Sequence, residues 1–266
     1  MAYNFLKKEL SQHHVKIYYS ESVGSRKTKP KDLVEIEYYE KECVYNKVVE
    51  EIKEKKLETD FDFFNDDFKS FELTKCTNVN SVAFIEEVSA FEPDLFISIR
   101  FAKIFKEEII KVPKKGILNL HSAILPDYKG IMGTLHNLKD NRKKYGCTLH
   151  YISSSGIDTG EIIAIAKINI QKEKSLLWHI VNLYPLGAKM ILDSIQKLKH
   201  IDKLPFKSQN RSVGNYFSVP TESDLEQLKA LGFKTFDEAD YIELLKKYIA
   251  QNLEFQVSDA LKASDT

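Results

Sequence analysis

The chain carries an amide, an imidazole and a carboxylate within residues 116–163, at spacings that could bring them together. Asn119 and His121 stand two residues apart at the end of an apolar run, so extended backbone places both side chains on one face of a strand. Asp158 lies between Gly156 and Gly160, where a tight loop can turn its carboxylate toward a neighbouring strand. Acyl transfer to an amine needs such a set: a donor for the tetrahedral oxyanion, a proton carrier, and an anion that orients the carrier. Each residue alone is more often a cap or a satisfied polar group, so the prediction depends on the three together.

Two motifs of this segment, NLHSAILPDYKG and GIDTGEII, resemble the folate-dependent formyltransferase family, which moves a formyl group from N10-formyltetrahydrofolate to an amine. The resemblance implies that Asn119, His121 and Asp158 are catalytic, with Asn119 and a protonated His121 holding the oxyanion. Ser122 departs from the family pattern, because many members carry Pro there. We expect the change to affect loop stiffness rather than chemistry, since Pro contributes a fixed φ and no functional group.

The resemblance also implies where the two substrates bind. The family lines its pterin pocket with the loop after the preceding strand and with the loop before the aspartate. The residues so assigned to N10-formyltetrahydrofolate are Lys103, Ile104, Phe105 and Ser154. Lys129 and Trp178 are assigned to the acceptor. Ordinary core packing is an alternative for Ile104, Phe105 and Trp178, and His150 is expected to be a packed histidine rather than a catalytic one.

The acceptor implied by the resemblance is a nucleotide-linked amino sugar. The segments SIRFAKIFKEEII and SLLWHIVNLY are similar to sugar N-formyltransferases, which favours a dTDP-4-amino-4,6-dideoxyhexose used in surface polysaccharide (O-antigen) synthesis. The alternatives are another amine, such as glycinamide ribonucleotide or methionyl-tRNA, and hydrolysis of formyltetrahydrofolate. Lys and Arg number 39, as do Asp and Glu, so the chain has no basic excess and nucleic acid is not an expected partner.

The patterning predicts an α/β fold with a Rossmann-like, doubly wound and mostly parallel sheet, which is the formyltransferase fold. That fold normally opens with a buried strand, whereas this sequence begins inside a helix over residues 2–12, so we expect the first strand to be missing. Residues 1–203 are predicted to form the catalytic domain. Residues 204–266 are predicted to form a small helical extension whose end, residues 251–266, frays.

Three further segments give predictions that the structure can test. Residues 33–38 have the alternation of a strand, and four phenylalanines recur at helical spacing. Those phenylalanines are Phe61, Phe64, Phe68 and Phe71. The loop Ser22–Lys31 is basic, and it is either a solvated loop or a contact for a nucleotide diphosphate.

The remaining composition excludes several classes of protein. The cysteines Cys43, Cys76 and Cys147 lie far apart with no metal-ligand spacing, so we expect free thiols and no metal site. The chain has no apolar run of about 18 residues, and its start is too charged for a signal peptide. We therefore expect a cytoplasmic protein without a membrane partner, and the sugar-modifying relatives imply a homodimer.

Overall fold

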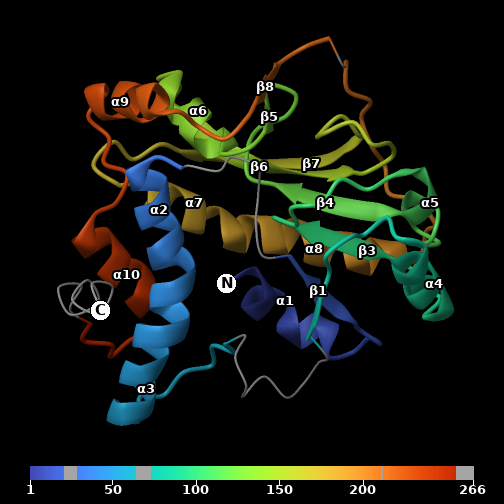
Figure 1. The fold of residues 1–266 in the computed structure, drawn as a ribbon, viewed down its shortest axis with the longest axis horizontal. Helices are drawn as coiled ribbons and strands as arrows, with labels where there is room; N and C mark the ends of the chain where they lie inside the picture. The colour runs from blue at the N-terminus through green and yellow to red at the C-terminus, as the bar shows by residue number, and fades with distance from the viewer. Residues whose placement is uncertain (21–28, 64–72, 211, 256–266) are drawn as a thin grey trace.

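The central sheet has four strands in the order β3-β4-β6-β7. The computed structural model describes residues 1–20, 29–63, 73–210 and 212–255. The strands are β3 (Phe96–Ile99), β4 (Ile117–His121), β6 (Lys144–Tyr151) and β7 (Ile162–Asn169). β3 and β4 are parallel, whereas β6 and β7 join in antiparallel fashion (Figure 1).

Two further pairs of short strands are also parallel. They are β1 (Ile17–Tyr19) with β2 (Leu73–Lys75), and β5 (Tyr128–Gly130) with β8 (Asn215–Phe217). Parallel strands need a long crossover between them, and here helices supply several of those connections. The predicted α/β fold class is thereby confirmed.

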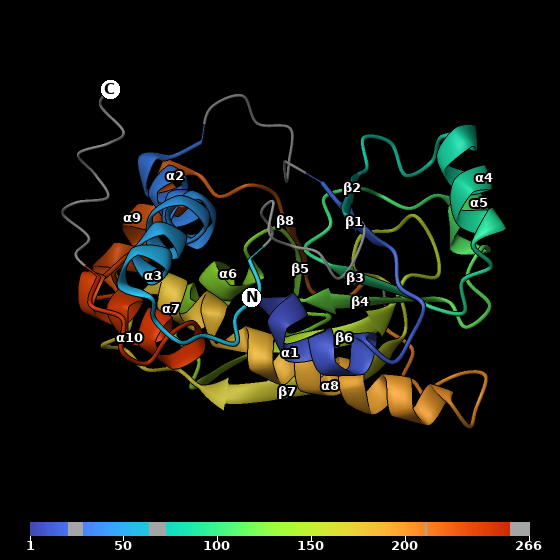
Figure 2. The same ribbon diagram turned by 90° about the horizontal axis from the view of Figure 1, so that it is seen from below.

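Helices α1 (Ala2–Leu10) and α8 (Leu183–Leu198) cover one face of the central sheet, as Figure 2 shows. Leu6 of α1 and Ile191 of α8 pack with Leu118 and Leu149 of the sheet in one buried cluster. Fully burying a leucine or isoleucine side chain contributes roughly 1.5–3 kcal/mol, so this layer holds the strands that carry the polar residues.

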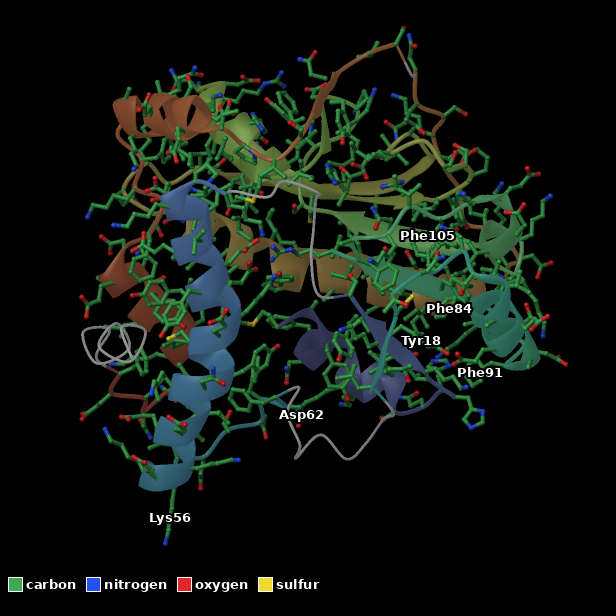
Figure 3. All side chains as sticks on the ribbon, in the orientation of Figure 1. Tyr18, Lys56, Asp62, Phe84, Phe91 and Phe105 are labelled. Carbon is green, nitrogen blue, oxygen red and sulfur yellow. The ribbon has the colours of Figure 1, made fainter. Side chains whose placement is uncertain are left out.

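Helices α4 (Val82–Ala90) and α5 (Glu107–Ile110) pack at the β3 side of the sheet. Ser81 caps α4, because its hydroxyl accepts a hydrogen bond from the Phe84 N–H at 3.3 Å. The side chains of Tyr18, Phe84 and Phe105 gather in one cluster beside these helices (Figure 3), and the centroids of the Tyr18 and Phe84 rings lie 4.9 Å apart.

A third layer joins segments from both ends of the chain. It comprises α2 (Lys31–Glu37), the π-helical turns η1 (Tyr38–Glu42) and η2 (Val44–Val48), α3 (Val49–Lys55), α6 (Gly133–Lys139), α7 (Leu176–Val181), α9 (Glu222–Ala230) and α10 (Glu238–Tyr248). The rod from α2 to α3 runs beside α10 (Figure 1), and buried side chains of the two share one hydrophobic cluster. The boundary predicted at residue 203 therefore does not separate two cores.

Two predictions of local structure were wrong. Residues 33–38 lie in α2 and the start of η1, not in a strand: Leu33, Ile36 and Tyr39 are buried at intervals of three residues, which is a helical period. Residues 251–255 do not fray, because Leu253 and Phe255 are buried in the third layer.

Some predictions fall outside the described residues. Most of the basic loop at residues 22–31 and the phenylalanines 64, 68 and 71 lie there, while Phe61 is buried. The three cysteines are free and buried, as expected. Within the described part of the chain, no helix has the length and apolarity needed to cross a membrane.

Candidate active site

Strand β4 ends at the predicted catalytic pair. Asn119 and His121 point to one side of the strand, and both line a single cavity of about 470 Å³. Asn119 lies in register with Ser98 on β3 and with His150 on β6, so both neighbouring strands bring polar side chains to this point. The predicted pair therefore belongs to a larger polar cluster, which consists of Asn119, His121, His150 and Asp158.

His150 belongs to this cluster, although the sequence indicated only a packed histidine. It is buried, but Asn119 Nδ2 lies 3.0 Å from its Nε2, and its Nδ1 lies 2.8 Å from the Tyr151 carbonyl oxygen. A carbonyl only accepts, so His150 Nδ1 carries a hydrogen, and an amide nitrogen only donates, so His150 Nε2 accepts from Asn119 Nδ2. This bond fixes the amide orientation and uses one of its two hydrogens. Only the antiparallel register of β4 and β6 could have revealed the contact.

Asp158 turns its carboxylate into the same cluster. Its φ of 52° lies in the left-handed region, which Asp tolerates better than most residues. Its Oδ2 accepts a hydrogen bond of 2.7 Å from the Gly130 N–H and lies 3.5 Å from His121 Nδ1, while Oδ1 lies 3.4 Å from His150 Nε2. The structure thus brings together the predicted residues Asn119, His121 and Asp158.

The electrostatics favour an ionised Asp158 beside a neutral His121. Burial alone would raise the pKa of Asp158, but its polar contacts, among them the hydrogen bond from the Gly130 N–H, lower it. Burial lowers the pKa of His121, and the opposing influence of Asp158 does not cancel that effect. The resting His121 is therefore neutral at pH 7, in contrast to the protonated form implied by the resemblance.

The tautomer of His121 follows from its backbone contact. His121 Nε2 lies 2.6 Å from the Tyr128 carbonyl oxygen, so this nitrogen carries the hydrogen and donates it. Nδ1 of the neutral ring then has a free lone pair close to Asp158. A proton that arrives at Nδ1 creates an imidazolium next to a carboxylate, which is a stabilised ion pair.

The residues predicted to bind folate line the same cavity as the polar cluster. They are Lys103, Ile104, Phe105 and Ser154. Phe105 also packs in the apolar cluster with α4 and α5, whereas Ile104 is exposed. Residues of α2 and η1 also line the cavity, although no sequence motif had indicated them.

Lys129 and Trp178, the predicted acceptor residues, do not line this cavity. Lys129 is buried, and its Nζ donates a hydrogen bond of 2.7 Å to the Val213 carbonyl. Trp178 is buried in the third layer, and its Nε1–H donates to Glu243 at 3.0 Å. Both side chains join the C-terminal segment to the rest of the fold, so the cavity lining gives no support to the prediction that they contact an acceptor.

The C-terminal segment supports the Asp158 loop, which sequence reasoning missed. Gln209 Nε2 donates to the carbonyls of Asp158 at 3.1 Å and Gly160 at 2.5 Å. Strand β8 pairs with β5, which ends at the Gly130 that binds Asp158. Gly130 has a φ of 93°, and a Cβ there would overlap the Phe217 carbonyl, so glycine is required.

The described residues contain no group of three or more His, Cys, Asp and Glu side chains that could hold a metal ion. The polar cluster can instead supply an amide hydrogen, a basic imidazole nitrogen and a carboxylate to molecules bound in the cavity.

Comparisons with known proteins agree on one family. The formyl transferase family model matches residues 23–177. Methionyl-tRNA formyltransferase of Methylacidiphilum infernorum is 27% identical over 139 residues, which is 52% of this chain and 43% of that protein. The bifunctional polymyxin resistance protein ArnA of Wigglesworthia glossinidia brevipalpis is 32% identical over 130 residues, 47% of this chain and 20% of that protein. The chain thus spans less than half the length of these curated relatives.

One solved structure with a similar fold is the formyltransferase PseJ from Anoxybacillus kamchatkensis, in complex with UDP-4,6-dideoxy-4-formamido-L-AltNAc and tetrahydrofolate. It is 21% identical with a TM-score of 0.47, and the match covers 87% of this chain and 97% of that one.

Proposed function

We propose that this chain, which belongs to the formyl transferase family, transfers a formyl group from N10-formyltetrahydrofolate to a primary amine. The observation that carries the proposal is the convergence of Asn119, His121, His150 and Asp158 on one cavity. The cluster contains a hydrogen-bond donor, a proton acceptor and an anion, which are the parts that amide-forming acyl transfer requires.

Asn119 is the proposed oxyanion donor. One of its amide hydrogens is held by His150 Nε2, so the second is free and its direction is fixed in advance. When the amine nitrogen attacks the formyl carbon, the carbonyl oxygen becomes an anion that this hydrogen stabilises. A donor that needs no reorientation stabilises developing charge at little cost in reorganisation.

His121 and Asp158 are the proposed proton carriers. The attacking amine must lose a proton as its bond to the formyl carbon forms, and the neutral Nδ1 of His121 can take it. The adjacent Asp158 carboxylate stabilises the resulting imidazolium. Breaking the bond between the formyl carbon and N10 then requires a proton on N10, and His121 can return the one that it took. The products are the formamide and tetrahydrofolate.

The loop Lys103–Phe105 and Ser154 are the proposed binding site for the pterin of the formyl donor. They line the cavity beside the cluster, and Ile104 of this loop is exposed. Pterins carry donors and acceptors on one edge, which suits recognition by a main-chain segment.

The proposed acceptor is a nucleotide-linked amino sugar, in particular a dTDP-4-amino-4,6-dideoxyhexose. The likeness of SIRFAKIFKEEII and SLLWHIVNLY to sugar N-formyltransferases supports it, and so does the balanced charge of the chain. Methionyl-tRNA is the second candidate, because the curated relatives include methionyl-tRNA formyltransferases at 27% identity.

Release of tetrahydrofolate from N10-formyltetrahydrofolate tests the proposal. The purified chain is incubated with dTDP-4-amino-4,6-dideoxyglucose, glycinamide ribonucleotide, methionyl-tRNA or no acceptor. Release that requires the sugar nucleotide supports the proposal, and release with methionyl-tRNA alone replaces it by the second candidate.

Release without acceptor indicates hydrolysis, and no release in any arm contradicts formyl transfer. The Asp158→Asn variant should lose activity, whereas Asp140→Asn, a matched change outside the cavity, should keep it.

A further inference from the structure

Glu40 places a buried carboxylate on the wall of the cavity that the catalytic cluster also lines. Its Oε1 accepts hydrogen bonds from the Arg100 guanidinium and from the Tyr184 hydroxyl, the latter at 3.0 Å. Arg100 Nη1 also donates to the Tyr184 oxygen at 2.8 Å. The Glu40 side chain is only 9% exposed, and its second oxygen, Oε2, is buried without a hydrogen-bond partner.

Glu40 and Arg100 both lie at local irregularities of the backbone beside the cavity. Glu40 lies in the π-helical turn η1, a geometry that is rare and frequently found at functional sites. Arg100 follows the last residue of β3 with a φ of 51°, which is left-handed and uncommon for a residue with a long side chain. Two such departures that meet at one ion pair suggest that its position serves a purpose.

The charge of the Glu40 carboxylate is already balanced. Burial alone would raise the pKa of Glu40, but Arg100 and Tyr184 lower it, so the carboxylate is ionised. Arg100 is therefore the cation that balances the Glu40 carboxylate. A neutralised carboxylate with one unfilled oxygen has no need of a second cation. It needs a hydrogen-bond donor, since an unsatisfied buried acceptor is costly.

We propose that Glu40 determines specificity for the acceptor, by accepting at Oε2 a hydrogen bond from a hydroxyl group of an amino sugar. The proposal rests on the proposed function and deepens it, because it names the substrate class as amino sugars with a free hydroxyl beside the amine. Ile36 and Ile180 line the cavity as well and offer apolar surface to the deoxygenated part of such a sugar.

The test compares two acceptors that differ by one hydroxyl: dTDP-4-amino-4,6-dideoxyglucose and its 3-deoxy analogue. For the wild-type chain we expect KM to be about tenfold lower for the sugar that has the hydroxyl, as for a hydrogen bond to a charged group. Glu40→Gln keeps the shape but replaces the charged acceptor by a neutral amide. It should remove most of the difference by raising KM for the hydroxylated sugar, with kcat and the KM for N10-formyltetrahydrofolate changed less than about threefold.

Glu37→Gln is the matched control on the same wall. Both oxygens of Glu37 are already held by Lys29, at 2.6 and 2.7 Å, so this variant should keep the wild-type preference. Glu40→Asp keeps the charge but shortens the side chain by one methylene, so it should also remove most of the difference, which gives a second measurement if Glu40→Gln does not fold.

Persistence of the preference in a folded Glu40→Gln or Glu40→Asp overturns the role of Glu40. An equal rise of KM for both sugars in Glu40→Gln also overturns it. Absence of wild-type turnover with either sugar instead overturns the proposed acceptor, and the subsite with it.

Discussion

At the scale of single residues, the site depends on hydrogens whose positions are already fixed. Asn119 uses one amide hydrogen on His150 and keeps the other, and His121 uses Nε2–H on the Tyr128 carbonyl and keeps the lone pair of Nδ1. Each polar group is thereby oriented before a substrate arrives, which is how active sites reduce reorganisation during the reaction.

Replacing Asn119 by Ala should lower kcat about 100-fold or more, because one oxyanion donor contributes roughly 2.7–4 kcal/mol in acyl-transfer sites. The KM for N10-formyltetrahydrofolate should change little. Steady-state release of tetrahydrofolate measures both constants, with the exposed Asn169→Ala as the control. Near wild-type kcat in Asn119→Ala would remove this residue from the mechanism.

The buried His136 makes stability fall in mild acid. It stacks on Phe217 with ring centroids 3.8 Å apart, and burial lowers its pKa to about 4. Below about pH 6.5 the unfolded chain therefore binds a proton at this histidine, whereas the folded chain does not. The free energy of unfolding should be about 2 kcal/mol lower at pH 5 than at pH 7.5.

Urea unfolding at pH 7.5 and pH 5 measures this effect. His136→Leu should show a smaller loss of stability over that interval, whereas the exposed His200→Leu should behave as wild type. The same pH slope in His136→Leu and wild type would show that other groups cause the loss.

At the scale of elements, loops outside the motifs hold the site in place. Asn80 Nδ2 donates to the Ile104 carbonyl at 2.8 Å, and its Oδ1 accepts from the Lys106 N–H at 2.8 Å, so one side chain braces the loop after β3. Gln209 braces the Asp158 loop in the same way through two backbone carbonyls.

Asn80→Ala should raise the KM for N10-formyltetrahydrofolate several-fold with a smaller change in kcat, because the loop loses two hydrogen bonds of about 1 kcal/mol each. The acceptor KM serves as the internal control. A rise in the acceptor KM alone would place the formyl donor elsewhere.

Gln209→Ala should instead lower kcat, by about tenfold, since Asp158 loses the support of its loop and small misplacements in an active site are costly. The KM for the formyl donor should stay within about twofold. Gln227→Ala, on the exposed side of α9, is the matched control, and unchanged kcat in Gln209→Ala would leave its bonds a purely structural role.

At the scale of the whole molecule, the C-terminal helices complete the core around α2 and η1. The Tyr241 hydroxyl of α10 donates to the Tyr39 carbonyl at 2.9 Å, and Tyr39 stacks on Phe236 at 3.9 Å. The part of the cavity wall that contains Glu40 is therefore held by contacts with the far end of the sequence, since Tyr241 is 202 positions from Tyr39.

Leu244→Ala should lower the free energy of unfolding by about 2–5 kcal/mol, as truncations of buried leucines do. Denaturation should remain one transition by circular dichroism and by loss of activity. Leu231→Ala, at an exposed position on the end of α9, should cost little. A separate early transition that spares activity would instead support an independent C-terminal domain.

Sequence alone determined the elements whose signal is local. The apolar run of β4, the cap at Ser81 and the glycines around Asp158 follow from period, capping and turn chemistry, and the two motifs select Asn119, His121 and Asp158. Only tertiary structure decided the rest. The contact of His150 with Asn119 depends on strand register, and α2 overrides a strand-like alternation through its packing on α10. The unpartnered oxygen of Glu40 likewise depends on how the chain packs around η1. Non-local pairing and burial are properties of the assembled chain, so no local pattern could reveal them.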